Sequence, residues 1–165
     1  MEQNGGLIAG IDIAERTIQA GIYDSEKCVI RTVNLLPEGK EKQPDEVYPV
    51  NKLVAECLRL SDESRIQSVC ITTSDFQMDE LNRMRDELEK AGIPRDRWQI
   101  ISKAESFAYY AYSQKRELYS SGVAIFDYGS NGIKCDMLAI RKKDNKNYLL
   151  QESTQYSSEA VCAAA

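Results

Sequence analysis

Two groups of three strand-like runs, one near each end of the chain, restrict the fold more than any other feature. The first group comprises Leu7–Asp12, Thr17–Tyr23 and Cys28–Leu36. The second group comprises Val123–Tyr128, Ile133–Ile140 (alternating around Cys135, Met137 and Ala139) and Tyr148–Thr154. Short alternating runs joined by tight polar turns are typical of antiparallel strands. The chain is therefore predicted to contain two three-strand meanders that form an internal pseudo-repeat, at a period too long for a solenoid.

The segment between the meanders predicts alternating helices and strands. Val50, Leu53, Val54 and Cys57 have the spacing of one helical face, as do Leu81, Met84, Leu88 and Ala91, with Gly92 as the expected left-handed stop. Short apolar strands are predicted at Arg65–Thr72 and Trp98–Ile101, and a third helix at 103–118. The predicted order is β-β-β-α-β-α-β-α, followed by β-β-β, which defines an α/β fold class.

Composition removes several classes of function. The chain of 165 residues has 21 Lys and Arg against 26 Asp and Glu, and its net charge of −5 argues against nucleic-acid binding. It has no histidine, which excludes Ser-His-Asp triads, histidine bases and histidine metal ligands. No apolar run approaches the ~20 residues that span a bilayer. The five cysteines are odd in number and lack CxxC spacing, so we expect free thiols in a cytoplasmic protein.

The chemistry is expected at the turn that follows the first strand of each meander. These two strands end in Asp12 and Asp127. A tight turn directs backbone N–H groups at one point and so cradles phosphate, while carboxylates hold the water molecules of Mg²⁺. Each turn alone is also an ordinary hairpin turn. The matching pair, in the same topological position, favours phosphate binding.

Four segments carry a resemblance to the actin-like ATPase superfamily, which includes actin, DnaK-type chaperones, the bacterial MreB, FtsA and ParM proteins, and sugar kinases. Leu7–Thr17 (LIAGIDIAERT) resembles the first phosphate motif, and Gly122–Gly129 (GVAIFDYG) resembles the start of the second. Ile71–Thr73 is similar to the strand before the long helix of the chaperones, and Ile101–Tyr112 is similar to their connecting motif. The resemblance implies a ribonuclease-H-like lobe over residues 1–121 and the first three strands of a second, truncated lobe over 122–165.

The resemblance also implies ATP or ADP with Mg²⁺ as ligands. Glu105 and Asp127 would be the catalytic residues, with Glu105 ordering the attacking or metal-bound water. Asp12 and Asp127 would hold Mg²⁺ through water. The phosphates would contact the two turns, whose residues are Asp12, Ile13, Ala14, Glu15, Arg16 and Thr17 in the first and Gly129, Ser130 and Asn131 in the second.

The chain departs from the superfamily pattern at both turns. Ala14 stands where the first motif has glycine, and Ser130-Asn131-Gly132-Ile133-Lys134 replaces a Gly-Gly-Thr-like stretch followed by an acid. No residue matches the catalytic lysine of the chaperones, and the glycine-rich adenosine motif of the second lobe is absent from this sequence.

Three hypotheses of function stay open at this point. The first is the N-terminal part of a nucleotide-dependent, DnaK-like ATPase switch from a bacterium, incomplete for catalysis alone. The second is a non-catalytic actin-like scaffold or protein-interaction domain, and the third is a sugar or acyl-acid kinase with a carboxylate base. Because one meander would lack covering helices, we also expect self-association, against which a concentration-independent monomer would count.

Overall fold

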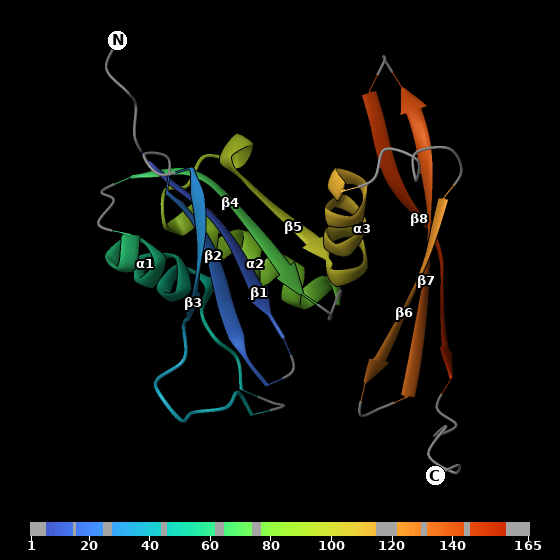
Figure 1. Cartoon of the computed structure of the whole chain (residues 1–165). Coiled ribbons are helices and arrows are strands. Elements are labelled where there is room, and N and C mark those ends of the chain that lie inside the picture. The colour runs from blue at the N-terminus through green and yellow to red at the C-terminus, as the bar shows by residue number, and fades with distance from the viewer. Residues whose placement is uncertain are drawn as a thin grey trace. The chain divides into compact units, whose positions relative to one another are not determined.

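The helices and strands follow the predicted order (Figure 1). A computed structural model describes residues 6–14, 16–24, 28–43, 46–61, 65–73, 77–114, 122–129, 132–143 and 146–157. The elements are β1 (Leu7–Ile13), β2 (Ile18–Asp24), β3 (Val29–Asn34), α1 (Val50–Ser61), β4 (Ile66–Thr73), α2 (Met78–Lys90), the short 3₁₀ helix η1 (Arg95–Arg97), β5 (Trp98–Ser102), α3 (Lys103–Gln114), β6 (Gly122–Gly129), β7 (Gly132–Lys143) and β8 (Lys146–Ser157). Glu15, Ser130, Asn131 and the predicted end of the third helix at 115–118 lie outside the described residues.

The first five strands form one mixed sheet in the order β3-β2-β1-β4-β5. β1, β2 and β3 are antiparallel neighbours, whereas β1, β4 and β5 run parallel. The parallel pairs need crossover connections, and α1 and α2 lie in those connections. The predicted first meander and the α/β fold class are confirmed by this arrangement.

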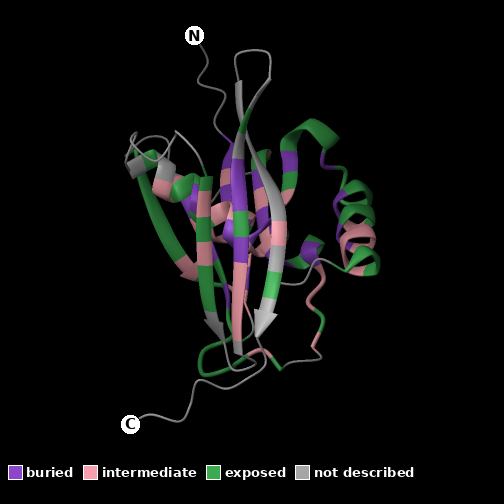
Figure 2. Ribbon diagram, turned by 90° about the vertical axis from the view of Figure 1, so that its right-hand side faces the viewer, coloured by how far each residue is buried: buried purple, intermediate pink, exposed green. Residues whose placement is uncertain are grey.

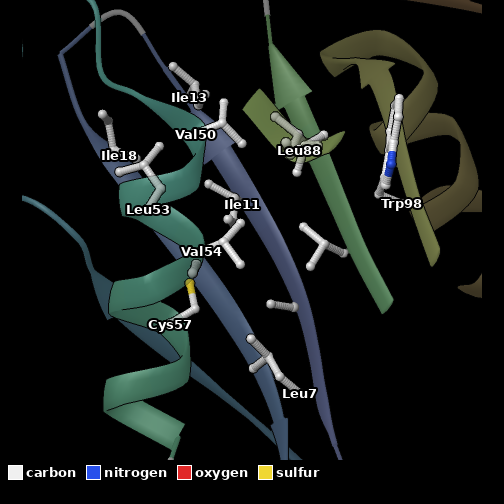
Figure 3. Packing of buried hydrophobic residues seen from close by; sticks show 14 of the residues in the cluster. Leu7, Ile11, Ile13, Ile18, Val50, Leu53, Val54, Cys57, Leu88 and Trp98 are labelled. Atoms are coloured by element: carbon white, nitrogen blue, oxygen red, sulfur yellow. The ribbon is translucent and has the colours of Figure 1, made fainter. Parts of the chain in front are cut away.

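One face of this sheet carries the main core. Alternate residues of β1 (Leu7, Ala9, Ile11 and Ile13) are buried, together with side chains of α1 and α2 such as Val54 and Leu88 (Figure 3). Period-2 burial in the strand and period-3.6 burial in the helices are the patterns of one sheet face covered by helices. The intervening β1 residues Ile8, Gly10 and Asp12 face the other side, where they are half-buried or exposed.

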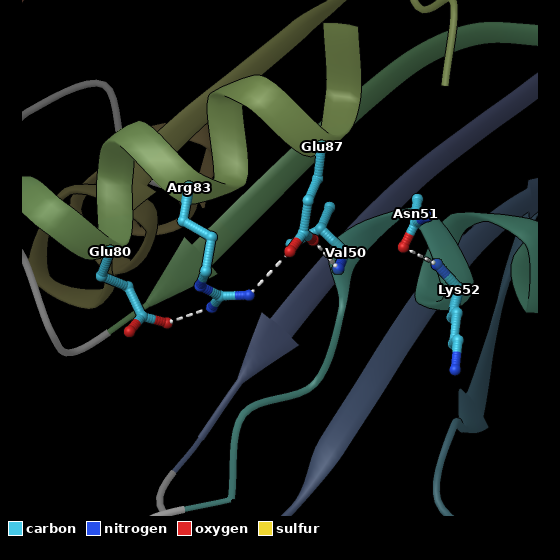
Figure 4. A network of polar contacts seen from close by, with 6 residues as sticks. All are labelled: Val50, Asn51, Lys52, Glu80, Arg83 and Glu87. Carbon is cyan, nitrogen blue, oxygen red and sulfur yellow. Dashed lines mark hydrogen bonds and ion pairs between the residues drawn. The ribbon is translucent and has the colours of Figure 1, made fainter. Parts of the chain in front are cut away.

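A polar network joins α2 to the start of α1 (Figure 4). The Val50 backbone N–H donates to a carboxylate oxygen of Glu87, and Arg83 donates to Glu87 over 2.9 Å and to Glu80 over 2.8 Å. The first turn of α1 contains no acidic residue of its own. Glu87 therefore supplies the negative charge that the N-terminus of a helix favours.

At its other end, α2 stops as the sequence predicts. Gly92 has a φ of +73°, the left-handed conformation that glycine adopts without strain. The Gly92 and Ile93 N–H groups donate to the Glu89 and Leu88 carbonyl oxygens. The glycine stop is thus confirmed.

The last three strands form a separate antiparallel sheet in the order β6-β7-β8. One face of this sheet packs against α3 through Ala104, Ala108 and Leu138, with Val123 and Ile125 beside them. Exposed and half-buried residues also run along these strands, as Figure 2 shows. The second meander is confirmed as well.

Burial matches the apolar alternation of the seventh strand only in part. The alternation centred on Cys135, Met137 and Ala139, of which Ala139 is buried and Met137 is 47% exposed, while Asp136 is 2% exposed. α3 contacts the face that carries Leu138. Residues two positions apart share a face, and packing against the helix decides which set is buried.

Tertiary contacts divide the chain into two units, Met1–Ser102 and Lys103–Ala165. The lobe boundary expected after residue 121 stays a prediction. In the described part of the chain, no helix is both long and apolar enough to cross a membrane.

Candidate functional site

The carboxyl ends of the parallel strands bring polar side chains together in the first unit. Ile13 pairs with Thr73, and Thr73 pairs with Ser102, so β1, β4 and β5 end in register. Thr73 and Ser102 are buried. In open α/β sheets, ligands bind outside the carboxyl ends of the strands. This edge of the first sheet is therefore the candidate site.

Asp12 lies one residue before this edge, on the sheet face opposite the main core. The residue is half-buried, and its Oδ1 atom is buried from solvent. Its register partners are Gln19 on β2 and Thr72 on β4. Partners in register point to the same face of a sheet. Gln19, Asp12 and Thr72 hence form one polar row, which we call the Asp12 row.

Sequence reasoning found Asp12 but not the other two members of the row. Gln19 lies seven residues away and Thr72 sixty residues away, so only strand register makes them neighbours. The alternation of β2 does indicate that Gln19 shares a face with Gly21, opposite Ile18 and Ala20. Combined with a hairpin register, that pattern would have located Gln19.

The turn from Ile13 to Ile18 is closed by its own backbone. The Ala14 N–H donates to the Thr17 carbonyl oxygen over 2.9 Å, and the Arg16 carbonyl oxygen accepts from the Lys42 N–H over 2.8 Å. Ala14 is half-buried, whereas Arg16 and Thr17 are exposed. The Ala14 N–H therefore serves turn closure, and among the described residues of this turn the Thr17 hydroxyl and the Arg16 guanidinium are the exposed side-chain groups.

The loop behind this turn has its own electrostatic contacts. Lys40 donates to Glu46 over 2.8 Å and lies over the Tyr48 ring, 5.4 Å from its centroid. The Glu46 hydrogen bond raises the pKa of Lys40 above its ordinary value and lowers the pKa of Glu46. Both groups thus stay charged at neutral pH in the loop whose Lys42 N–H holds the Arg16 carbonyl.

Glu105 and Asp127, the predicted catalytic residues, both belong to the second unit. Glu105 is half-buried in the first turn of α3, and its sequence position three residues after Ser102 is that of a helix capping box. Asp127 is exposed near the end of β6. Gly129, the last residue of β6, pairs with Gly132.

Lys134 lies directly opposite Asp127 on the neighbouring strand. Its Nζ atom is 2.9 Å from the Asp136 Oδ2 atom. A lysine and two carboxylates therefore occupy the same face of the second sheet. Sequence reasoning noted Lys134 as a departure but did not find its partner.

The two units differ in the side-chain groups that they offer to a metal ion. Among the described residues, no three His, Cys, Asp or Glu side chains form a group that could hold a metal ion. The Asp12 row offers only oxygen donors besides the Gln19 amide nitrogen, and these suit the hydration shell of Mg²⁺. Opposite Asp127, by contrast, stands Lys134, whose ammonium nitrogen is paired with Asp136.

These features define the fold. A mixed sheet in the order β3-β2-β1-β4-β5, followed through α3 by a second antiparallel sheet, is the actin-like ATPase fold, and the predicted resemblance is confirmed at the level of the fold. More particularly, the chain belongs to the family of unknown function DUF5716, whose C-terminal model matches residues 36–163. The match includes α1 through β8 and leaves out Asp12.

Solved structures show the same fold at low sequence identity. A ROK family glucokinase from Streptomyces griseus, in complex with glucose and AMPPNP, is 18% identical over 93% of this chain and 49% of its own, with a TM-score of 0.52. The ethanolamine utilization protein EutJ from Carboxydothermus hydrogenoformans is 13% identical over 96% of this chain and 54% of its own, with a TM-score of 0.49. YeaZ from Pseudomonas aeruginosa is 10% identical over 97% of this chain and 71% of its own, with a TM-score of 0.47.

The chain thus spans about half the length of the glucokinase and of EutJ. No curated protein sequence matches it.

Proposed function

We propose that this chain is part of a nucleotide-binding protein of the actin-like ATPase type, with ATP or ADP as ligand. The observation that carries the proposal is the Asp12 row, a carboxylate between an amide and a hydroxyl at the carboxyl ends of parallel strands. The glucokinase of the same fold was solved with the ATP analogue AMPPNP. That complex makes a nucleoside triphosphate the ligand to test.

Within this proposal, the Asp12 row would hold the water shell of Mg²⁺. A magnesium ion bound to a nucleotide neutralises part of the phosphate charge and orients the phosphates. Asp12 would accept hydrogen bonds from metal-bound water, and Gln19 and Thr72 would keep that water in place. The Thr17 hydroxyl, exposed in the following turn, would donate to a phosphate oxygen.

Glu105 would order the metal-bound or attacking water molecule, as the superfamily resemblance implies. We assign no turnover to this chain by itself, because it spans about half of the glucokinase. More specifically, we propose that the longer protein is a nucleotide-dependent ATPase switch of the DnaK-like type. A bacterial, cytoplasmic location belongs to the proposal as well, since ATP is a cytoplasmic ligand.

The test is a titration of the 165-residue chain, and in parallel of any longer natural form, with AMPPNP and ADP. Isothermal calorimetry and thermal shift are both recorded with Mg²⁺. Ligand at about 100 times its dissociation constant should add ~2.7 kcal/mol of stability. If the nucleotide stabilises neither form, the proposal is contradicted.

Asp12→Asn is the decisive variant, because it keeps the shape of the side chain and removes its charge. It should weaken Mg²⁺-AMPPNP binding about tenfold or more, the effect of losing a charged hydrogen bond. Asp86→Asn is the matched control, since Asp86 is an exposed carboxylate on α2 of the same unit. It should leave the affinity unchanged.

A non-catalytic scaffold is the second candidate, and two departures from the superfamily pattern favour it. Ala14 uses its N–H group to close the first turn, and Lys134, where the superfamily has an acid, is paired with Asp136. Self-association also stays a prediction. Phe126 at 58% exposure is an apolar side chain that a second copy would cover, and concentration-independent sedimentation as a monomer would contradict it.

A further inference from the structure

β3 is an edge strand of the first sheet, open to solvent on the side away from β2. In the order β3-β2-β1-β4-β5, β2 is its one strand partner among the described residues. Five of its six residues are exposed, and Ile30, at 69%, is the most exposed large apolar side chain in the described part of the chain. An open edge presents a row of unpaired backbone groups, which is a template for another strand.

The features that usually protect an edge strand are missing from β3. Natural edges are blunted by lysine, by proline or by a β-bulge. β3 contains no lysine and no proline, and its pairing with β2 shows no register shift. Its single charged residue, Arg31, donates from its guanidinium group to the Leu60 carbonyl oxygen in the last turn of α1. Arg31 is therefore engaged by α1 and does not guard the edge.

The open side of β3 is formed by the backbone groups of Ile30, Thr32 and Asn34. The N–H of Leu35, the residue after β3, donates to the Ile18 carbonyl oxygen on β2 over 2.9 Å. In an antiparallel pair, residues alternate between those that hydrogen-bond to the neighbouring strand and those that point to the other side. The odd-numbered residues of β3 therefore bond to β2, and the three even-numbered residues point away from the sheet.

A second copy of β3 fits this edge in a register that uses all three outward residues. A twofold axis normal to the sheet relates two antiparallel copies of one strand, so one residue faces its own twin. With Thr32 on the axis, the two Thr32 residues exchange hydrogen bonds, and Ile30 of each copy does so with Asn34 of the other.

Charge also favours the Thr32 register. It places Arg31 opposite Val33 of the second copy, so the two arginines do not face each other, and it pairs two threonines, a favourable cross-strand combination. A register centred on Arg31 opposes the two arginines and leaves Asn34 without a partner on β3. The strand is thus complementary to itself about Thr32.

We propose that the chain forms a twofold dimer in which two copies of β3 pair antiparallel about Thr32 and join the two five-strand sheets into one. The inference does not depend on nucleotide binding. It assigns self-association to the first unit, whereas Phe126 on the second sheet is the competing surface. A contact made mainly by one strand is small, so we expect a dissociation constant of about 10–100 µM.

Sedimentation velocity of the 165-residue chain, from well below to well above that concentration, tests the dimer. Wild type should pass from monomer to dimer. Thr32→Pro removes an outward N–H, which an edge strand tolerates, and Ile30→Lys adds the usual edge guard. Both variants should stay monomeric. Phe126→Lys, at a residue that is 58% exposed on the second sheet, is the matched control and should dimerise as wild type does.

Disulfide trapping tests the register. In a Cys28→Ser background, which removes an exposed native thiol, Thr32→Cys brings two thiols together on the axis. Their Cα atoms would be ~5.5 Å apart, within the range of a disulfide. Ile30→Cys places the twin thiols four residues out of register, ~13 Å apart along the strands. Oxidation should therefore give a covalent dimer with Thr32→Cys and leave Ile30→Cys monomeric.

Circular dichroism of every variant shows whether it is folded, and a Thr32→Pro chain that does not fold leaves the decision to Ile30→Lys and to the disulfides. Wild type that remains a monomer throughout overturns the proposal. A dimer that persists in folded Ile30→Lys overturns it too, as does a dimer that Phe126→Lys abolishes, since association would then use the second sheet. Trapping of Ile30→Cys in preference to Thr32→Cys overturns the Thr32 register and the proposal with it.

Discussion

Glu87→Ala tests the contact that joins α2 to α1 in the first unit. Glu87 accepts a hydrogen bond from the Val50 backbone N–H, the first of α1, and from Arg83. Val50 is buried, so its N–H is left in a largely apolar surrounding when the carboxylate is removed. Loss of a helix N-cap costs about 1 kcal/mol, with a range of 0.5–2. The half-exposed Arg83 ion pair adds ~0.5 kcal/mol.

We therefore expect Glu87→Ala to lower the free energy of unfolding by about 1.5–2 kcal/mol. For a chain of this size, that corresponds to a fall in Tm of ~3–8 °C. Glu87→Gln keeps an oxygen acceptor and loses the charge, so it should cost about half as much. Glu89→Ala, at an exposed position of the same helix, should stay within ~0.5 kcal/mol of wild type.

Urea denaturation followed by tryptophan fluorescence is the appropriate assay. Trp98 is the single tryptophan, it is buried in the first unit, and Arg95 lies 4.1 Å from its ring centroid. The signal thus reports on the unit that contains the contact. If Glu87→Ala and Glu89→Ala unfold at the same urea concentration, Glu87 does not cap α1 and the argument is wrong.

Three further predictions concern other residues. Gly122→Ala should destabilise the chain by about 1–3 kcal/mol in thermal unfolding, because a Cβ there would lie 2.8 Å from the Leu138 carbonyl oxygen. Gly10→Ala is its control and should be neutral or slightly stabilising, since no atom lies within 4 Å of a Cβ at that position. Glu105→Gln should preserve the stability of α3, because glutamine also completes a capping box. Glu105→Ala should lower the free energy of unfolding by ~1 kcal/mol. If both variants unfold alike, Glu105 does not act as a cap. Burial raises the pKa of the Cys57 thiol from 9.0 to about 11, so the unfolded chain should ionise first and stability should fall between those pH values, by up to ~3 kcal/mol. Urea titrations at pH 8 and pH 10.5 should show this loss, and Cys57→Val should abolish it.

The order of elements could be predicted from the sequence because each element carries its own local signal. The alternation of β2, the helical spacing from Val50 and the left-handed stop at Gly92 all depend on residues close in the chain. Such signals need no knowledge of the neighbouring strands. They were sufficient to predict the two meanders and the α/β class.

The candidate site was only partly predictable, because most of its relations depend on register. Asp12 was identified from its position at a strand end, whereas Thr72 becomes its neighbour only when β1 and β4 pair in parallel. The Glu87 contact with Val50 joins residues 37 positions apart. No local pattern encodes a partner at that distance.

The partial mismatch between alternation and burial on β7 has the same origin. The more apolar set of alternate residues includes Met137, but α3 packs on the set that includes Leu138, and this buries Asp136. A strand that buries its charged residue and exposes its methionine is not optimised for stability. Asp12, half-buried at the end of an otherwise apolar strand, breaks the pattern of β1 in the same way. Asp12 lies one residue before the end of β1, whereas Asp136 lies on the face of β7 that packs against α3. In each sheet the charged residue interrupts an apolar pattern, and local alternation cannot predict such an interruption because the packing partner comes from elsewhere in the chain.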